Sequence, residues 1–312
     1  DNLTEETIYV LDSPILSNSQ IKKFKKLFAS KIRTIDCTFK TTETLKEGLE
    51  KIKNEAEISV REGSTTLILS DKNIGSTRAN IPMVLAVGAI NSHLVNLGLR
   101  GYCSINVETS ETLDTHSFAV LIGVGATTIN PYLTIDSIFQ RFEKKLFGEL
   151  SFNDCVLRFK KSIENGLLKI MSKMGISVIS AYRGGCNFET VGLSRALVSD
   201  YFPGMVSRIS GIGIKGIEEK IKELHEKAFK KDVYILPIGG IYKYRKSGEE
   251  HQFQGKLIHT LQHAVGSGSY ETYKKYSDGI HGLKPINLRD LLDFRKDKEE
   301  IDVKDVEPIH EL

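Results

Sequence analysis

Short apolar runs alternate with longer amphipathic stretches through the first two thirds of the chain. Residues 32–39 (IRTIDCTF) alternate apolar and polar positions, as a strand with one buried face does. Residues 65–71 (TTLILSD) are nearly continuously apolar, which is typical of a strand buried in a parallel sheet. We predict further strands over residues 102–111, 117–126 and 176–182.

Helical spacing separates these runs. Ser17 is a candidate N-cap for a helix over residues 17–29, Thr41 for one over 41–60, and Pro82 for one over 82–99. Alternating strands and helices indicate parallel strands joined by crossover helices. The predicted fold class is therefore α/β: a mostly parallel sheet with flanking helices. Further helices are predicted over residues 134–148, 151–173 and 214–230.

The last part of the chain has a different pattern. One short amphipathic piece, INLRDLLDF (286–294), is followed by a charged run that contains proline. We predict a scaffold domain over residues 1–276 and a connector over residues 277–312. In that connector the apolar side chains of residues 286–294 are expected to dock on a neighbouring surface.

Composition limits the possible partners. The chain has 312 residues, 40% of them hydrophobic and 27% charged, and 43 basic against 40 acidic residues give a net charge of +3. This balance indicates neither nucleic acid nor a membrane surface as a partner, and no apolar run reaches the roughly 20 residues of a membrane span. The start, DNLTEET, is not a signal peptide and lacks an initiator Met, so we expect an excised or processed piece.

Four cysteines are scattered along the chain without a C-x-x-C pair or a neighbouring histidine cluster. This spacing argues against a zinc or iron–sulfur site built from this chain alone. Free, buried cysteines are typical of a reducing compartment, so a cytoplasmic location is expected. The cysteines are Cys37, Cys103, Cys155 and Cys186.

The candidate site is the segment YRGGCNFE (182–189), which is expected to join the end of a strand to the start of a helix. Backbone N–H groups at Gly184 and Gly185 can converge on an anion there, and Arg183 adds positive charge. The alternative, which we favour, is a corner in which Tyr182 and Arg183 end the strand and Arg183 contacts a neighbouring domain. Cys186 is a weak candidate nucleophile, because Glu189 is the only acid–base residue near it in the sequence.

Other motifs are less specific. Residues 123–132 (GVGATTINPY) and 211–216 (GIGIKG) lack the spacing of a phosphate-binding loop and are interpreted as turns into helices. His259 and His263 lie four apart on a predicted helix, but no H-E-x-x-H pattern accompanies them. An exposed helix face explains this histidine pair better than a metal site does.

The region around the candidate loop resembles a known family. Residues 166–194 (GLLKIMSKMGISVISAYRGGCNFETVGLS) are similar to a segment near the middle of the large ferredoxin- or pyridine-nucleotide-dependent glutamate synthases. The resemblance covers about residues 12 to 312, and its blocks follow the family's order. The other similar blocks are residues 67–74, 81–100, 118–133, 208–217, 239–265, 270–280 and 286–294.

The resemblance implies a role without catalysis on this chain. In the family this region is the central domain, a rudimentary barrel-like α/β relative of the FMN-binding barrel. It lies between a glutaminase domain and an FMN-binding synthase domain. The parent enzyme makes L-glutamate from glutamine and 2-oxoglutarate and passes ammonia through an internal path, which this domain helps to form.

The resemblance also implies which groups belong elsewhere. FMN and an iron–sulfur cluster belong to the parent enzyme, and no cofactor, metal or catalytic residue is expected on this chain. The implied partners are the two flanking domains of the same polypeptide, with an electron-donor subunit or ferredoxin as the source of electrons.

Two other interpretations stay open from the residues alone. One is a free-standing α/β enzyme, or a phosphate- or flavin-binding domain, that uses the loop from Arg183 to Gly185. The other is a pure interaction module.

Overall fold

The computed structural model describes residues 10–230 and 237–311. Its contacts divide the chain into two compact units, Asp1–Lys231 and Asp232–Leu312. The predicted boundary between residues 276 and 277 falls inside the second unit and stays a prediction.

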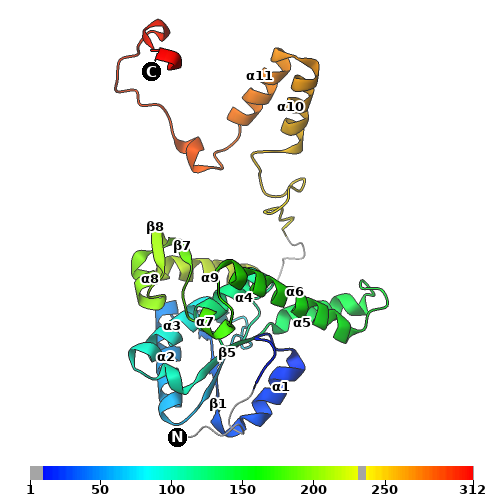
Figure 1. Ribbon diagram of the computed structural model, residues 1–312, viewed down its shortest axis with the longest axis vertical. Helices are drawn as coiled ribbons and strands as arrows, with labels where there is room; N and C mark the ends of the chain where they lie inside the picture. The colour runs from blue at the N-terminus through cyan, green and yellow to red at the C-terminus, as the bar shows by residue number, and fades with distance from the viewer. Residues whose placement is uncertain (1–9, 231–236, 312) are drawn as a thin grey trace. The chain divides into compact units, whose positions relative to one another are not determined.

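The first unit is built on a four-stranded parallel sheet in the order β1-β3-β5-β6 (Figure 1). Each strand is added beside the one before it in the chain, which is also the strand arrangement of (β/α) barrels. The predicted α/β fold with a mostly parallel sheet is confirmed. The strands are β1 (Ile32–Asp36), β3 (Thr66–Ser70), β5 (Ser104–Glu108) and β6 (Thr128–Asn130).

The two faces of this sheet are covered by different helices. Leu67 and Leu69 belong to the main core, whereas Ile68 packs in a separate cluster with α1 (Asn18–Leu27). This alternation follows from the period of two along a strand. On the main-core side lie α2 (Leu45–Arg61) and α3 (Met83–Asn96), on the opposite side of the strands from α1 in Figure 1.

Side-chain caps set where these helices begin. Ser17 forms a capping box with Gln20 at the start of α1, as predicted. The cap of α2 is Thr44, paired with Glu47, and not the predicted Thr41. Thr44 is the N-cap because the Glu47 side chain, three residues later, accepts a hydrogen bond from the Thr44 backbone N–H.

The chain before α1 extends the sheet. Leu16 N–H donates to the Ile129 carbonyl at 2.9 Å, and Ile129 N–H donates to the Pro14 carbonyl at 2.8 Å. Residues 14–16 therefore lie parallel to β6 at the edge of the sheet.

Two predicted strands are helices. Residues 117–126 were predicted as a strand, but they fall largely in α4 (Thr115–Gly123), which Asp114 caps through the Ser117 N–H. A helix that is buried almost all round carries the same continuous apolar pattern as a buried strand, which is why this prediction was wrong. The segment 123–132, interpreted as a turn, contains β6.

Residues 176–182 were likewise predicted as a strand, and this was wrong. They end in the short helix α7 (Ile179–Tyr182). Ile176, Ile179 and Tyr182 are three residues apart and all pack against the main core, so the helical spacing outweighed their β-branched composition.

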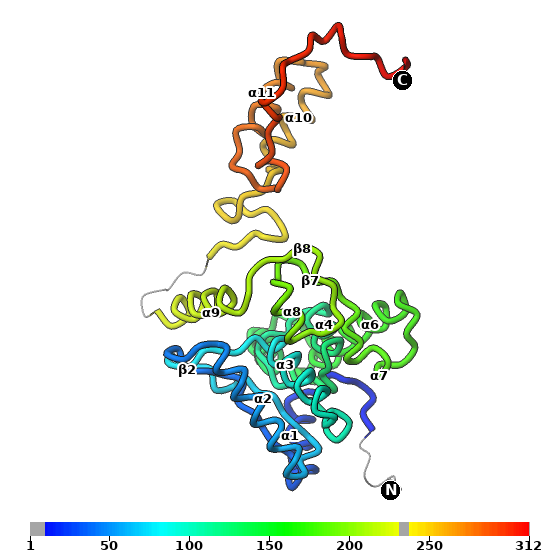
Figure 2. Tube along the Cα trace, turned by 90° about the vertical axis from the view of Figure 1, so that its left-hand side faces the viewer, coloured from blue at the N-terminus to red at the C-terminus, as the bar shows by residue number. Residues whose placement is uncertain are grey.

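A small parallel pair follows α7, where a helix was predicted. It consists of β7 (Glu189–Leu193) and β8 (Val206–Ile212), joined through α8 (Arg195–Tyr201). The helix α9 (Ile214–Phe229), predicted over 214–230, lies against α2 and against β4 (Arg78–Asn80), which pairs antiparallel with β2 (Thr38–Lys40) (Figure 2). The remaining elements of the first unit are η2 (Ala29–Lys31), η3 (Arg100–Tyr102), α5 (Tyr132–Glu143) and α6 (Phe152–Lys173).

The second unit is a pair of packed helices followed by an extended tail. A Cβ added to Gly279 would lie 2.5 Å from Leu257 Cδ2, so α10 (Gly255–Ser267) and α11 (Tyr270–His281) touch through this glycine. The tail carries three short 3-10 turns, η4 (Leu288–Leu291), η5 (Val303–Asp305) and η6 (Ile309–Glu311).

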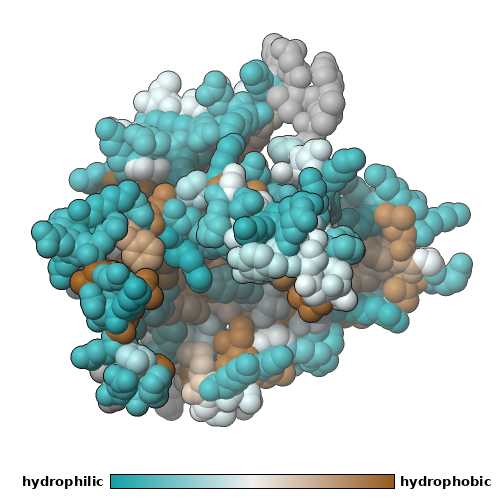
Figure 3. Space-filling view, turned by 90° about the horizontal axis from the view of Figure 1, so that it is seen from above, coloured by the Kyte–Doolittle hydropathy of each residue, from teal (hydrophilic) through white to brown (hydrophobic). Residues whose placement is uncertain are grey.

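The surface is mostly polar. On the face in Figure 3, hydrophobic side chains gather only in small separate patches. Over residues 10–230 and 237–311, no helix is both long and apolar enough to cross a membrane.

Candidate functional site

The predicted loop follows α7 on the main-core side of the first unit. Tyr182 is only 1% exposed, and its hydroxyl donates to the Ala119 carbonyl at 3.2 Å. Its ring meets that of Phe188 edge-on, with centroids 6.2 Å apart. Tyr182 is therefore an anchor that fastens the loop to α4. It ends a helix, and the prediction that Tyr182 and Arg183 end a strand was wrong.

The backbone N–H groups of Gly184, Gly185 and Cys186 are all engaged in hydrogen bonds. Gly184 donates to the Ile122 carbonyl at 3.1 Å, Gly185 to Tyr182 at 3.2 Å and Cys186 to Gly123 at 3.1 Å. No N–H group at these three residues is left to converge on an anion. Arg183 is the only charged residue among loop residues 182–185.

Close packing explains the glycines around the loop. Gly184 has φ +70°, a left-handed conformation that side chains other than glycine rarely adopt. A Cβ on Gly123 would lie 2.1 Å from the Phe188 ring. These two positions hold the loop tightly against the end of α4.

Cys186 does not have the surroundings of an activated thiol. Burial raises its pKa, which favours the thiol over the nucleophilic thiolate. Glu189, the acid–base residue nearest in the sequence, pairs with Arg208 at 3.4 Å instead. All four cysteines are free.

Arg183 borders a hollow of about 350 Å³. Arg100, from η3, lines the same hollow, so the structure brings together two arginines that are 83 residues apart in the sequence. Sequence analysis singled out Arg183 but not Arg100, which carries no motif.

A second polar group lies at the carboxyl edge of the sheet, where parallel α/β folds commonly place ligands. Asp71 follows β3, Glu108 ends β5 and Asn130 ends β6. All three are at most 1% exposed. Sequence analysis missed them, although each polar residue directly follows or ends an apolar strand, which is the signal that marks this edge.

Hydrogen bonds tie these strand ends together. One carboxylate oxygen of Asp71, Oδ2, accepts from the Thr109 hydroxyl at 2.8 Å and from the Ser110 N–H at 2.8 Å. The buried acceptors Asp71 Oδ1 and Asn130 Oδ1, like Thr112 Oγ1, have no hydrogen-bond partner among the described residues. Burial and the negative charge of Asp71 raise the pKa of Tyr132 beside them.

Glu108 is paired with two lysines. Lys25 from α1 lies 2.6 Å from its Oε2, and Lys72 lies 2.7 Å from its Oε1. Burial by itself raises the pKa of Glu108, but the two ammonium groups hold it below its usual value. Lys72 also lies 4.9 Å from the centre of the Tyr132 ring.

For Glu111 the opposing influences on the pKa have the opposite net result. It accepts from the N–H of Met83, at the start of α3, at 2.7 Å and from the Asn80 amide at 2.6 Å. Burial is the largest influence and raises its pKa to about 6, helped by the nearby charge of Asp71. Glu111 thus accepts a hydrogen bond from the start of α3 in surroundings that disfavour its ionised form.

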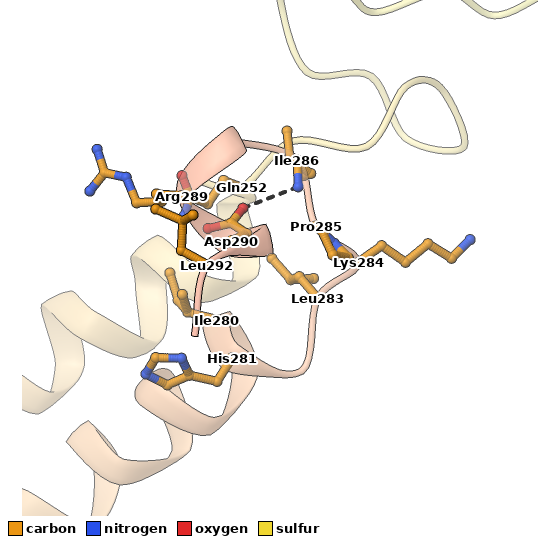
Figure 4. A pocket seen from close by; sticks show the side chains of 10 residues that line it. All are labelled: Gln252, Ile280, His281, Leu283, Lys284, Pro285, Ile286, Arg289, Asp290 and Leu292. Carbon is orange, nitrogen blue, oxygen red and sulfur yellow. Dashed lines mark hydrogen bonds between the residues drawn. The ribbon is translucent and has the colours of Figure 1, made fainter. Parts of the chain in front are cut away.

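The histidine pair lies on α10, as predicted, but gathers no ligand set. Among the described residues, no group of three or more His, Cys, Asp or Glu side chains is placed to hold a metal ion. A hollow of about 480 Å³ does exist in the second unit (Figure 4). There Asp290 accepts from the Ile286 N–H at 3.1 Å, while Lys284 and Arg289 point outward.

The side chains at these two places are held firmly by their neighbours. The buried charge of Glu108 at the sheet edge is neutralised by two lysines, and the cysteine of the loop, Cys186, is held as a thiol. These features suit a rigid unit that presents surfaces to something else.

Comparison with known proteins identifies the family. The family model described as "Glutamate synthase central domain" matches residues 2–194. The NADPH glutamate synthase large chain of Azospirillum brasilense is 48% identical over 98% of this chain and 20% of its own length. The corresponding large chain of Bacillus subtilis is 37% identical over 95% of this chain and 20% of its own.

A ferredoxin-dependent relative is similar over the same extent. The chloroplastic ferredoxin-dependent glutamate synthase of Spinacia oleracea is 34% identical over 96% of this chain and 19% of its own length. The chain thus spans about a fifth of the length of the curated relatives it matches. It belongs to the glutamate synthase central domain family.

Proposed function

We propose that this chain is the central structural unit of a glutamate synthase large chain, linking a glutaminase domain to an FMN-binding synthase domain. The observation that carries this proposal is 48% identity over 98% of the chain to a fifth of a glutamate synthase large chain. Such a protein makes L-glutamate from glutamine and 2-oxoglutarate. Both NADPH- and ferredoxin-dependent relatives are similar, so the electron donor of the longer protein is one of these two.

In this role the chain helps to form the path that carries ammonia between the two active sites. A reactive intermediate is kept from bulk water by closely packed walls. The first unit offers such walls, because its sheet edge is closed by buried, hydrogen-bonded side chains such as Asp71 and Thr109.

FMN and the iron–sulfur cluster belong to other parts of the longer polypeptide in this proposal. The cysteines of this chain support a reducing, cytoplasmic setting, because all four are free and three of them are buried.

The competing proposal, a phosphate- or flavin-binding enzyme centred on Arg183 to Gly185, has less support. Its phosphate would need backbone N–H groups, and those of Gly184 and Gly185 are already engaged.

A flavin titration separates the two proposals. The purified chain is titrated with FMN by fluorescence, and then assayed with glutamine, 2-oxoglutarate and a reduced electron donor. We expect no stoichiometric flavin binding and no glutamate formation. A yellow protein that binds one FMN per chain, or measurable turnover, would show that the chain is an enzyme in its own right.

A further inference from the structure

The hollow beside the predicted loop is enclosed by segments distant in the sequence. The C-terminal part of α3 and the η3 turn form one side, and the end of α4 and the α7 loop form the other. Of the residues that the structure describes, no acidic one lines it. The lining residues are Asn91, Val95, Arg100, Gly101, Gly125, Ser180, Arg183 and Gly184.

Arg100 is held in place by neutral acceptors only. Its Nε donates to Asn91 Oδ1 at 2.7 Å, its Nη1 to the Cys103 carbonyl at 2.6 Å and its Nη2 to the Gly125 carbonyl at 3.0 Å. A guanidinium group has five N–H donors, so two remain after these three bonds. The half-buried positive charge is therefore oriented but not neutralised.

Arg183 adds a second unneutralised charge. Its guanidinium group forms no hydrogen bond or ion pair with any residue that the structure describes, yet it is close enough to act on Arg100. Burial lowers the pKa of Arg100, and the charge of Arg183 lowers it further. Two like charges at one hollow repel each other unless an anion lies between them.

We propose that this hollow binds a carboxylate group between the guanidinium groups of Arg100 and Arg183. A planar carboxylate matches the fork of a guanidinium group and can accept two N–H bonds from it. A phosphate fits less well, because the N–H groups of the adjoining loop are engaged with carbonyls. This proposal does not depend on the proposed function of the chain.

The carboxylate can come from two sources. One is a free dicarboxylate, and the other is an acidic side chain elsewhere in a longer polypeptide. Both present the same group to the same two arginines, so the experiment has one arm for each source.

The first arm titrates the purified chain with glutarate at constant ionic strength by calorimetry. Inorganic phosphate is the comparison anion. Arg183→Gln is the test variant, because the Arg183 side chain forms no hydrogen bond or ion pair with a described residue and its loss should leave the fold intact. Arg141→Gln, at an exposed arginine on α5, is the matched control for the loss of one charge.

If the carboxylate is free, glutarate binds saturably and more tightly than phosphate. Arg183→Gln then weakens binding at least tenfold (about 1.4 kcal/mol or more). Arg183→Lys, which keeps the charge but not the fork, recovers only part of the affinity, and Arg141→Gln changes nothing.

The second arm uses the full-length polypeptide and the arginine reagent phenylglyoxal, with modified residues located by mass spectrometry. If an acidic side chain fills the hollow, Arg183 reacts at least tenfold more slowly than Arg141 in the full-length protein, but at a similar rate in the chain alone. The proposal is overturned if glutarate does not bind and Arg183 and Arg141 react alike in both proteins. Binding of phosphate as tight as that of glutarate would also overturn the assignment to a carboxylate.

Discussion

Glu108 and Glu111 are three residues apart, the first buried and the second exposed, and their pKa values move in opposite directions. Two lysine ammonium groups lie within 2.7 Å of Glu108 and favour its charged form. Among the described residues, Glu111 accepts only from the Met83 N–H and a side-chain amide, so the local desolvation of its carboxyl group prevails. The partners of each carboxyl group, more than its depth, decide its charge.

Glu111 should therefore make stability fall as the pH rises. Its folded pKa of about 6 lies above the ordinary 4.5, so its contribution is complete below pH 4.5 and is lost as the pH rises through 6. Because the side chain is exposed, solvent screening keeps this loss below the roughly 2 kcal/mol that the full shift would give. The free energy of unfolding, measured with urea between pH 4.5 and 7, should fall in the wild type by this additional amount relative to Glu111→Gln.

Glu108→Gln is the matched control with the opposite sign. The folded pKa of Glu108 lies below its ordinary value, so its contribution is present above about pH 4.5 and is lost as the pH falls through the lowered folded value. The stability gap between the wild type and Glu108→Gln should therefore narrow on acidification. A Glu111→Gln profile that runs parallel to that of the wild type from pH 4.5 to 7 would refute the assignment.

Two adjacent residues of the candidate loop should contribute differently to stability, because the Tyr182 side chain forms a buried hydrogen bond and that of Arg183 forms none with a described residue. Tyr182→Phe removes a buried hydrogen bond and should lower the free energy of unfolding by about 1 kcal/mol. Arg183→Ala removes an exposed side chain without hydrogen bonds and should change it by less than about 0.5 kcal/mol. Chemical denaturation measures both. A larger loss for Arg183→Ala than for Tyr182→Phe would mean that Arg183 supports the fold.

At the scale of elements, α3 and α8 touch through a glycine. A Cβ on Gly88 would lie 2.4 Å from the Phe202 ring and 2.7 Å from the Tyr201 carbonyl oxygen. Ser92, one turn further along α3, donates to the same carbonyl at 3.1 Å. The backbone oxygen cannot move without α8, so the close approach depends on the missing side chain.

Gly88→Ala should therefore destabilise the first unit by about 1–3 kcal/mol despite the better helix propensity of alanine. Gly75→Ala serves as the control, because nothing lies within 4 Å of its added Cβ. Thermal unfolding followed by circular dichroism measures both variants. Equal melting temperatures for the two would mean that α8 does not pack on Gly88 as the structure shows.

Much of the element order could be predicted from the sequence. The strands β1, β3 and β5 and the helices α1, α2, α3, α6 and α9 lie within a few residues of their predicted places. In these elements the apolar period agrees with local signals, such as the Ser17 cap and Pro82. A segment can be predicted from the sequence when its local conformational preference agrees with the packing it adopts in the fold, as it does in these elements.

The rest depended on contacts that the sequence does not show. α4 is apolar on most sides, so its helical period was hidden, whereas α7 is a short helix preceded by β-branched residues that favour a strand, and the packing of Tyr182 and its neighbours made it a helix. The two-arginine hollow joins residues from four elements, and Arg100 stands in no motif. Its chemistry depends on which carbonyls surround a guanidinium group, and that is fixed only once the chain has folded.

At the scale of the whole molecule, the apolar residues of the tail are exposed. Leu292 and Phe294 are 78% and 93% exposed, so the predicted docking of residues 286–294 on a neighbour stays a prediction. Leu292→Asp should leave the melting temperature of this chain unchanged, because it removes no buried contact. Leu257→Asp, between α10 and α11, is the control and should lower it. A clear loss for Leu292→Asp would show that the tail packs on this chain.

The proposed linking role makes a prediction for the full-length enzyme. Arg183→Ala should raise the ratio of glutamine consumed to 2-oxoglutarate reduced, because a weakened contact with a neighbouring domain uncouples the two reactions. Arg141→Ala should leave the ratio unchanged. Both amounts are measured in the same assay. A ratio that stays at the wild-type value in Arg183→Ala would exclude this arginine from coupling.

The edge pairing of residues 14–16 with β6 has a consequence for how the protein is made. During synthesis, β1, β3, β5 and β6 leave the ribosome in the order in which they lie in the sheet, so each can add to strands that have already emerged. Residues 14–16 are made before these four strands, but their partner Ile129 appears more than a hundred residues later. At about 5–20 residues per second, this is a delay on the order of ten seconds. Within this unit, the segment before α1 is thus the last to be fastened to the sheet, whereas the apolar face of α1 can pack on Ile68 as soon as β3 has formed.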